Sequence, residues 1–431
     1  MRSFQLLLMM LFACFTAVSQ ITIDECQRQA RENYPLIKKY DLVRQSADFS
    51  VSNAAKAYLP QVSLGAQATY QSDVPSFPEQ MTQIYQQMGV NMAGLNKDQY
   101  KIALEINQVI WDGGMTKAQK DIARAEGSVS TQNVETEMYQ IRERINQLFF
   151  GILALREQLA QNTLLKDLLQ SNYENVTSLV HNGVALESDL DMVKAEQLTA
   201  SQQRTQIESA ITAYCQMLSV MTGMKIAETE TFEKPGIHLL NSEISGLENA
   251  RPELQLLEAQ AQQFEAQKKA VNATTMPRLG LFAQGFYGYP GLNMFEDMMR
   301  DKWSWNYLAG VSLQWNFGSF YTRKGNLKKL QLAQQQVETQ RDVFLFNNQL
   351  QQLQQQNEIE KMRKLTADDE EIIKLRTAIR QSSEAKYANG TMTINELLRD
   401  ITAENQASLT KSIHEIERIR QIYELKNTVN Q

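Results

Sequence analysis

The chain has 431 residues, of which 43% are hydrophobic, and a formal net charge of −6. Acidic and basic residues are mixed along the helices, so we expect no nucleic-acid partner. Beyond the N-terminal segment there is no run of 18 or more apolar residues, so we expect no transmembrane helix.

Residues 1–20 have the pattern of a signal peptide. Arg2 gives a short basic start, an apolar core too short to span a bilayer follows, and Ala17 and Ser19 are the small residues that precede a cleavage site. We therefore expect an exported protein. Cys14 follows a sequence that weakly resembles a lipoprotein cleavage box, so lipidation stays open as an alternative.

Proline is absent from two long stretches, between Pro78 and Pro235 and after Pro290. Because proline in a helix interior costs about 3 kcal/mol, such stretches permit long helices. Each stretch contains one Asn-Gly pair far from its ends, and each follows two short segments of alternating polarity. The sequence therefore predicts a mainly α, internally duplicated chain. Each half has two strands, a very long helix, a tight turn and a returning helix.

The first strand pair is predicted at residues 60–70 and 100–111. Apolar and polar residues alternate in both segments, as in strands with one apolar and one polar face. The apolar positions are Val62, Leu64, Ala66, Ala68 and Tyr70, then Ile102, Leu104, Ile106 and Ile110.

The second strand pair is predicted at residues 277–289 and 306–317. Aromatic residues cluster at both ends of the last strand, which is typical of the girdles of a membrane barrel. They are Trp303, Trp305 and Tyr307 at one end and Trp315 and Phe317 at the other. The alternative, a soluble sandwich, is less favoured because no further strand signal occurs.

Four strands cannot close a barrel, and an open sheet edge does not persist in lipid. Bacterial outer-membrane barrels have at least eight strands, so we expect a homotrimer with a 12-stranded outer-membrane barrel. Its outer face would meet outer-membrane lipid. The residues expected to face the lumen are Gln61, Lys101, Glu105 and Asn316. The loops at residues 72–99 and 291–302 are expected together at the cell exterior.

Residues 115–181 are predicted as one helix of 67 residues, about 100 Å long at 1.5 Å per residue. Apolar residues recur there in the seven-residue pattern of a coiled coil. The apolar positions are Ile141, Ile145, Leu148, Ile152, Leu155, Leu159, Leu169, Tyr173, Val176 and Val180. A weaker seam is expected in the second half at Leu330, Val337, Phe344, Leu365, Ile372 and Ile379. A free-standing coiled coil is the alternative, but it does not explain the strands.

The two tight turns align at a constant offset of 207 residues. Gly183 and Gly390 can take the left-handed conformation that ends a helix. Ser188, and either Thr393 or Asn395, can cap the returning helices. The hairpin tips, expected far from the strands, are Asn182, Gly183, Val184, Asn389, Gly390 and Thr391.

The predicted organisation follows chain order. A signal peptide (1–20) precedes N-terminal helices (21–59), the first strand pair with its external loop (60–114) and the first long helical hairpin (115–223). An equatorial linker and helix (224–276), the second strand pair with its external loop (277–319) and the second long hairpin (320–431) follow.

These motifs, in order and repeated, resemble the TolC-like outer-membrane efflux family over nearly all of the mature sequence. Residues 21–35 resemble its opening helix, with Cys26 where a small alanine is common. Leu59-Pro60 and Met276-Pro277 resemble the starts of its first and third strands. Trp111-Asp-Gly-Gly114 and Phe317-Gly-Ser319 resemble its strand-to-helix exits.

The resemblance implies a trimer in the outer membrane of a Gram-negative bacterium, with a long α-helical barrel in the periplasm. It implies an export duct of a tripartite efflux or type I secretion system. The implied partners are a periplasmic adaptor (membrane fusion) protein at the hairpin tips and an inner-membrane RND or ABC transporter that supplies the energy. The alternative is a trimeric coiled coil with a structural or adhesive role. Drugs, metals, bile-type detergents and proteins all stay open as cargo.

The resemblance also implies a periplasmic gate. Asp189 and Tyr387 occupy positions similar to an inter-helix tether, and Glu396 is expected about two turns into the returning helix, where three copies form an acidic ring. The chain departs from the family at Met392, where arginine is common, and at Arg399, where an acidic residue is common.

Nothing in the sequence supports catalysis. His181, His238 and His414 lie in unrelated segments, and there is no phosphate loop, paired-cysteine metal motif or nucleophile elbow. We therefore expect no enzyme, cofactor or metal site. Cys26 and Cys215 are expected as packing residues, with a disulfide between them as the alternative.

Overall fold

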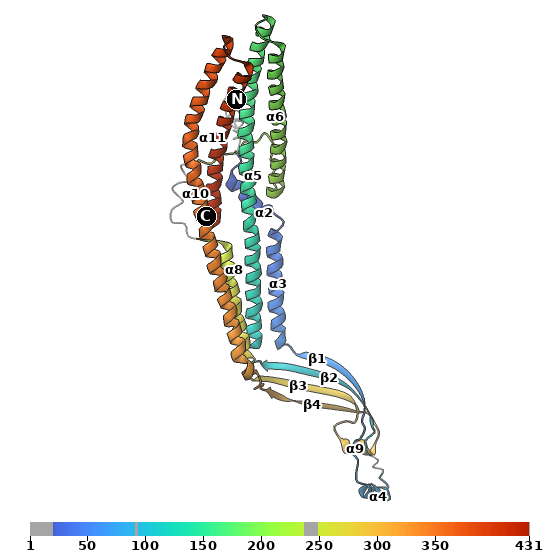
Figure 1. Ribbon diagram of the computed structural model, residues 1–431. Helices are drawn as coiled ribbons and strands as arrows, with labels where there is room; N and C mark the ends of the chain where they lie inside the picture. The colour runs from blue at the N-terminus through green and yellow to red at the C-terminus, as the bar shows by residue number, and fades with distance from the viewer. Residues whose placement is uncertain (1–19, 91–93, 237–248, 431) are drawn as a thin grey trace, which may run out of the picture. The chain divides into compact units, whose positions relative to one another are not determined.

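The structure is a computed structural model that describes residues 20–90, 94–236 and 249–430 (Figure 1). The expected signal peptide up to Ser19, with Cys14, lies outside the described residues, as does His238. The chain divides into two compact units. The helical unit comprises Met1–Asp41, Gln132–Leu256 and Gln340–Gln431, and the sheet unit comprises Leu42–Thr131 and Leu257–Thr339.

The sheet unit contains one antiparallel sheet with the strand order β1-β2-β3-β4 (Figure 1). Its strands are β1 (Gln61–Tyr70), β2 (Asp98–Trp111), β3 (Arg278–Tyr289) and β4 (Ser304–Gln314). The register places Leu64, Leu104, Gly285 and Tyr307 side by side across the sheet. All four strands predicted from alternation are therefore present.

Strand β4 is shorter than predicted, because it ends at Gln314. Trp315 donates its indole N–H to the Thr275 carbonyl at 3.0 Å, and the Asn316 side-chain oxygen accepts the backbone N–H of Gly318 at 3.0 Å. These side-chain bonds turn the backbone toward the next helix. Asn316 therefore lies in this turn rather than on the strand.

The two loops predicted to lie together are in contact. Helix α4 (Glu79–Gln87) lies in the first loop and helix α9 (Met294–Met299) in the second. The rings of Phe77 and Phe295 have centroids 6.1 Å apart, and the backbone N–H of Asn96 donates to the Tyr289 hydroxyl at 3.1 Å. The sequence analysis did not predict these two short helices.

Asp112 joins strand β2 to helix α5 (Met115–His181). Its buried carboxylate accepts the Tyr58 hydroxyl at 2.9 Å and the backbone N–H groups of Gly114 at 2.9 Å and Thr116 at 2.6 Å. Gly113 has φ of +69°, and a Cβ there would lie 2.3 Å from the Met276 Cβ. The Trp-Asp-Gly-Gly segment is thus a strand-to-helix exit, as predicted.

The long helices match the predicted alternation of long and returning helices. They are α2 (Ile23–Asn33), α3 (Ile37–Ala55) with the short helix η1 (Lys56–Tyr58), α5, α6 (Glu187–Thr222), α8 (Pro252–Ala273), α10 (Ser319–Ala388) and α11 (Ile394–Val429). Helices α3, α5, α8 and α10 contribute residues to both units. Among the helices of the described residues, none combines the length and the apolar character needed to cross a membrane.

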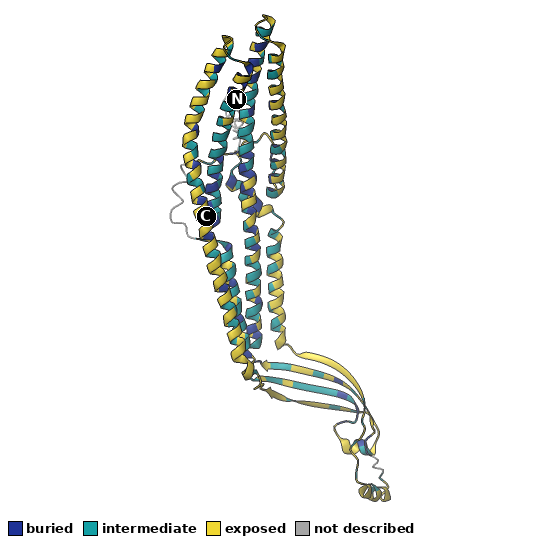
Figure 2. Cartoon of the chain, in the orientation of Figure 1, coloured by how far each residue is buried: buried dark blue, intermediate teal, exposed yellow. Residues whose placement is uncertain are grey.

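The core of the helical unit is built from large side chains of α5. Phe149 and Phe150 are buried, with ring centroids 5.4 Å from Phe232 and 5.3 Å from Tyr423. The predicted seam of α5 is buried at Ile141, Ile145, Leu148, Ile152, Leu169 and Val176. Figure 2 shows buried stretches along the length of this helix. Helix α5 therefore packs through the pattern that its sequence shows.

Cys26 and Cys215 are both buried, and neither forms a disulfide. Burial, followed by the negative charge of Glu25, raises the pKa of the Cys26 thiol to about 12. Burial also raises the pKa of the Cys215 thiol. Both cysteines are packing residues, as expected.

Helix α10 buries the predicted stripe only in part. Ile372 and Ile379 are 45% and 43% exposed, so they form no seam within this chain. The buried positions instead include the polar residues Asn348, Gln355, Asp369 and Ser383, which share a seven-residue register. Of the predicted second seam, Val337 is buried and Leu330, Phe344 and Leu365 are half-buried. The prediction was wrong at Ile372 and Ile379, where the chain buries the polar stripe instead.

Candidate functional site

One face of the sheet is apolar and uncovered. Leu64, Tyr307 and Val311 are 74%, 85% and 66% exposed. Leu104 lies on this face between Leu64 and Gly285 in the register. Because water disfavours an exposed apolar surface of this kind, the face is suited to contact with an apolar phase.

The opposite face carries a polar cluster. The Lys101 ammonium donates to the Gln284 side-chain oxygen at 3.0 Å, and the Gln284 amide donates to Glu105. Lys101 also lies 4.3 Å from the centroid of the Phe286 ring. The structure therefore brings Lys101 and Glu105 together through Gln284, a residue that the sequence analysis did not single out.

Gln61 lies on the same face as this cluster, opposite Asn107 in the register. Its side-chain amide donates to the carbonyls of Leu59 at 3.0 Å and Lys56 at 3.4 Å, at the start of β1. Asn316, the fourth residue expected on this face, lies beyond the end of β4.

Aromatic rings gather at both ends of β4. At one end Trp303 stacks on Tyr100 at 5.9 Å, and Tyr287 lies 5.0 Å from Trp305 between ring centroids. At the other end the rings of Trp315 and Phe317 are 4.8 Å apart. Because strands rise about 3.3 Å per residue and tilt by about 40° in a barrel, ten residues of β4 span roughly 25 Å along its axis. That height is about equal to the height of the apolar band of an outer-membrane barrel.

The two hairpin turns are built by the same backbone hydrogen bonds. Gly183 and Gly390 have φ of +71° and +68°. The N–H of Gly183 donates to Val180 at 3.0 Å, and that of Gly390 to Tyr387 at 2.9 Å. In the first turn the backbone N–H groups of residues 182 and 184 donate to the carbonyls of residues 178 and 179. In the second turn the N–H groups of residues 389 and 391 donate in the same way to the carbonyls of residues 385 and 386. The offset of 207 residues seen in the sequence therefore applies to the turn geometry as well.

The caps beyond these turns differ from the prediction on one side. Thr393 caps α11 by accepting the Glu396 N–H at 3.4 Å, as one of the two expected alternatives. Helix α6 begins after Leu186, whose backbone N–H donates to the Asp189 carboxylate at 3.2 Å. Ser188 is not the cap because it already lies in the first turn of α6.

Glu396 and Asp189 both act in the first turns of their helices. The Glu396 carboxylate accepts the Thr393 N–H at 3.0 Å and the Thr393 hydroxyl at 2.8 Å, and these bonds lower the pKa of Glu396. The expected position of Glu396, about two turns into α11, was wrong, since α11 begins at Ile394.

Tyr387 packs against a buried cluster that joins the two hairpins behind their tips. This cluster consists of Leu169, Val176, Val193, Ala200, Ile394, Leu397, Leu398 and Ile401. Burial, followed by the charge of Asp189, raises the pKa of the Tyr387 phenol. Among the described residues, its buried hydroxyl has no hydrogen-bond partner. The tether to Asp189 is not formed within this chain and stays a prediction for the assembled protein.

Polar contacts between α10 and α11 were missed by the sequence analysis. Ser383 donates to Asp400 at 2.6 Å, and Asp369 lies 2.7 Å from the His414 Nδ1. Farther along, the Asn348 amide donates to the Thr428 carbonyl at 2.7 Å. The seven-residue spacing of the polar residues of α10 was the available signal. It was overlooked because coiled-coil seams are normally apolar.

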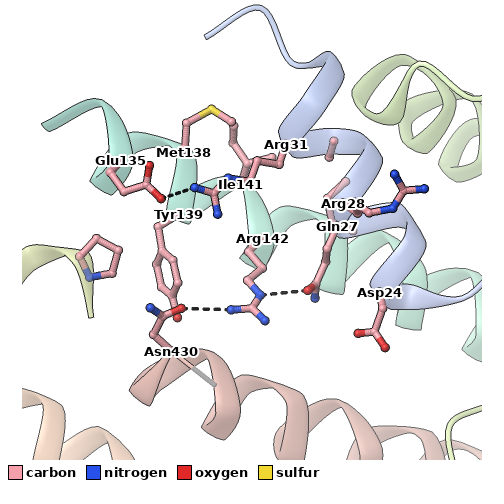
Figure 3. Close-up of a pocket in the computed structure, with 13 residues that line it drawn as sticks. Asp24, Gln27, Arg28, Arg31, Glu135, Met138, Tyr139, Ile141, Arg142 and Asn430 are labelled. Carbon is pink, nitrogen blue, oxygen red and sulfur yellow. Dashed lines mark hydrogen bonds and ion pairs between the residues drawn. The ribbon is translucent and has the colours of Figure 1, made fainter. Parts of the chain in front are cut away.

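A separate cavity of about 370 Å³ lies in the helical unit between α2, α5 and the end of α11 (Figure 3). Arg142 donates to Gln27 at 2.9 Å and to Asn430 at 3.2 Å, and Arg31 forms an ion pair with Glu135. None of the residues predicted for the lumen, tips or gate lines this cavity. In the part of the chain that the structure describes, no three histidine, cysteine or carboxylate side chains gather as metal ligands.

Residues 27–224 match the family of outer membrane efflux proteins. No curated protein matches the chain. The match agrees with the family resemblance predicted from the sequence and with the outer-membrane location. The family is one of channel proteins rather than enzymes.

Solved structures with the same fold cover 94% of this chain. CusC superposes with a TM-score of 0.67 at 13% identity over 91% of its own chain. The outer-membrane channel OprN has a TM-score of 0.64 at 13% identity over 89% of its chain. The outer membrane protein VceC from Vibrio cholerae has a TM-score of 0.64 at 13% identity over 94% of its chain. The chain thus has the fold of outer-membrane efflux channels over nearly its whole length, and the TolC-like resemblance is confirmed.

Proposed function

We propose that this protein is the outer-membrane duct of a tripartite efflux or type I secretion system. The observation that carries the proposal is the sheet, which has an uncovered apolar face, a polar face with Lys101 and Glu105, and two unpaired edges at β1 and β4. An open edge in lipid leaves backbone hydrogen-bonding groups unsatisfied at a cost of several kcal/mol each. Three copies joined edge to edge remove these edges and enclose a polar lumen of 12 strands.

A second observation favours a trimer. Helix α10 leaves apolar residues uncovered along the helical unit, with Phe346 at 61% and Val343 at 54% exposure. Leu350, Leu353, Ile372 and Leu375 belong to the same uncovered set. Their spacing of three and four residues is that of a coiled-coil seam. A neighbouring subunit would cover this stripe, which the chain itself leaves to solvent.

The tips would meet a periplasmic adaptor, and the adaptor would connect the duct to an inner-membrane RND or ABC transporter. Val184 and Leu186 at the first tip are 70% and 69% exposed, and they offer apolar contacts to such a partner. Since the sequence has no nucleotide-binding motif, the transporter would supply the energy.

The proposal is tested in planar lipid bilayers with the purified full-length protein. A duct gives discrete conductance steps of uniform size, and a strain lacking the gene accumulates cargo that the wild-type gene clears. A structural or adhesive coiled coil would give neither result. Protein that inserts into the bilayer yet never conducts, even with the gate residues substituted, would contradict the duct.

A further inference from the structure

The beginning of α10 carries a concentrated positive charge that the duct does not require. Residues 319–337 contain Arg323, Lys324, Lys328 and Lys329 and no acidic residue. Within the described residues, none of these four side chains forms an ion pair with a carboxylate. Uncompensated cations at one place on a helix attract an anionic ligand.

Three of these cations share a groove with apolar side chains. Phe320, Arg323, Lys324, Leu327 and Lys328 are spaced three and four residues apart, so they lie on one side of α10. They line a groove of about 1000 Å³ that belongs to the sheet unit. Glu338 also lines the groove, so positive charge exceeds negative charge there, beside an apolar surface.

The cations of the groove differ in whether they already have a hydrogen-bonding or charged partner within the chain. Lys268 of α8, also in the groove, is paired with Glu265 at 2.8 Å. Arg323 donates twice to the Asn272 side-chain oxygen, at 3.0 and 2.8 Å, which holds its guanidinium in place. Lys328 reaches only the neutral Gln331, at 3.3 Å. Lys324 and Lys328 are therefore the ammonium groups available to an anion.

The groove begins next to the aromatic end of the sheet. Helix α10 starts at Ser319, directly after the Trp315 and Phe317 ring pair. Lys324 lies about 8 Å and Lys328 about 14 Å along the helix from Ser319, at 1.5 Å per residue. The headgroup layer adds about 5–8 Å to each side of the hydrocarbon core, and lysine side chains extend toward such a layer.

We propose that this groove holds an anionic phospholipid of the leaflet on the helical side of the membrane. The inference rests on the proposed embedding of the sheet in the membrane. The lipid phosphate would lie between Lys324 and Lys328, and its glycerol and upper acyl chains would lie on Phe320 and Leu327. Each lysine near an anionic lipid surface contributes attraction without a need for shape complementarity.

The same stretch of α10 also offers apolar side chains to a neighbouring subunit. Tyr321 and Leu332 are its exposed apolar residues outside the groove. At about 100° per residue, Tyr321 and Leu332 lie about 100° and 140° from Phe320 and Leu327, respectively, but only about 20° and 40° from Lys328. A subunit packed on Tyr321 and Leu332 would leave Phe320 and Leu327 open to lipid and would compete with lipid for Lys328, so the test also follows the trimer.

The test uses the full-length protein in neutral detergent, titrated with phosphatidylglycerol or with phosphatidylcholine of the same acyl chains. Native mass spectrometry counts the lipids retained per trimer. The wild type should retain phosphatidylglycerol in preference. Lys324→Gln with Lys328→Gln should weaken this retention about tenfold or more, because two cations are lost. Lys329→Gln with Lys386→Gln is the matched control, since it removes the same charge outside the groove and should have little effect.

Four results would overturn the lipid site: equal retention of both lipids by the wild type, equal loss in both variants, displacement of phosphatidylglycerol by inorganic phosphate, or loss of the trimer in the groove variant. The last result would make the groove a subunit interface. Conductance is recorded on the same preparations. Protein that inserts but does not conduct even with the gate residues substituted contradicts the duct, whereas absent lipid preference with normal conductance contradicts the lipid site alone.

Discussion

Asp112 shows how one carboxylate holds a strand-to-helix joint. Burial by itself would raise the pKa of its carboxyl group, but hydrogen bonds from Thr116, Tyr58 and Gly114 outweigh burial and lower it. Because the pKa in the folded state lies below that of the unfolded chain, the ionised carboxylate stabilises the fold above about pH 4. This contribution is lost as the pH falls through the folded pKa.

Asp112→Ala should therefore lower the free energy of unfolding by about 1–2 kcal/mol at neutral pH, as loss of a helix cap does. It should also reduce the loss of stability as the pH falls below about 4. Thermal denaturation of the detergent-solubilised protein across pH measures both effects. Asp121→Ala is the control: its carboxylate pairs with Arg124 and Lys269 at 3.3 Å, and about 0.5 kcal/mol is expected. Equal losses of unfolding free energy in both variants would show that the Asp112 cap stabilises the protein no more than a surface ion pair does.

Asp189 and Tyr387 carry the gate prediction. A phenol bonded to a carboxylate contributes about 1.5–3 kcal/mol where it is partly buried, enough to favour a closed state that adaptor contacts can open. Asp189→Ala with Tyr387→Phe should raise conductance in planar bilayers. Unchanged conductance in the double variant would place the closure elsewhere.

Glu396→Gln separates charge from capping in the same experiment. Glutamine at this position can still complete a capping box with Thr393, so helix α11 should keep its start. The variant should weaken cation selectivity and block by divalent or trivalent metal ions, because three copies of the carboxylate are lost. Retained selectivity would show that Glu396 serves only as a cap.

At the scale of elements, the turns at the hairpin tips depend on glycine. Gly183 and Gly390 have positive φ and donate their N–H groups. Proline supplies neither, so Gly183→Pro or Gly390→Pro should abolish export. Trimers should persist, because the buried cluster of the hairpins lies behind the tips. Export assays and detergent-phase mass measurement check this. Gly183→Ala is a milder control at a cost of about 1–2 kcal/mol. Crosslinking from Val184 that never captures an adaptor would count against docking there.

The sheet makes a prediction about its two faces. Cysteines at Gln61, Lys101 and Glu105 should react with water-soluble thiol reagents in intact membranes, whereas cysteines at Leu104 and Val311 should not. Leu104→Arg should hinder insertion, because a charge on the lipid face near the bilayer middle costs about 2–4 kcal/mol. The measurement is the rate of thiol labelling of each cysteine variant in membranes, compared between the two faces of the sheet. Equal labelling of both faces would remove the barrel assignment.

At the scale of the whole molecule, the unpaired edges of β1 and β4 and the uncovered stripe of α10 predict a homotrimer. Multi-angle light scattering or native mass spectrometry of the detergent-solubilised protein should give three copies. Phe346→Glu should weaken the trimer, because it would place a carboxylate in the apolar contact. Lys374→Glu, on the exposed surface of the same helix, is the control. A stable monomer with its strands intact would contradict the model.

The sequence by itself determined the helices, strands and turns whose formation depends on neighbouring residues. Missing prolines permitted α5 and α10, alternation with a period of two placed β1 to β4, and Asn-Gly pairs placed two turns with the same hydrogen bonds. These features depend on residues close together in the chain, so a single sequence is sufficient to predict them.

Only the tertiary structure decided which stripe of α10 is buried, because a helix with a polar and an apolar stripe has two possible partners. Asn348, Gln355, Asp369 and Ser383 are buried on the polar stripe, and Ile372 and Ile379 stay exposed on the other. The same holds for the turn at Asn316, the bridge from Lys101 through Gln284 to Glu105, and the unpartnered hydroxyl of Tyr387. Each of these features depends on contacts between segments far apart in the chain. Such contacts cannot be predicted from the local pattern and spacing of residues.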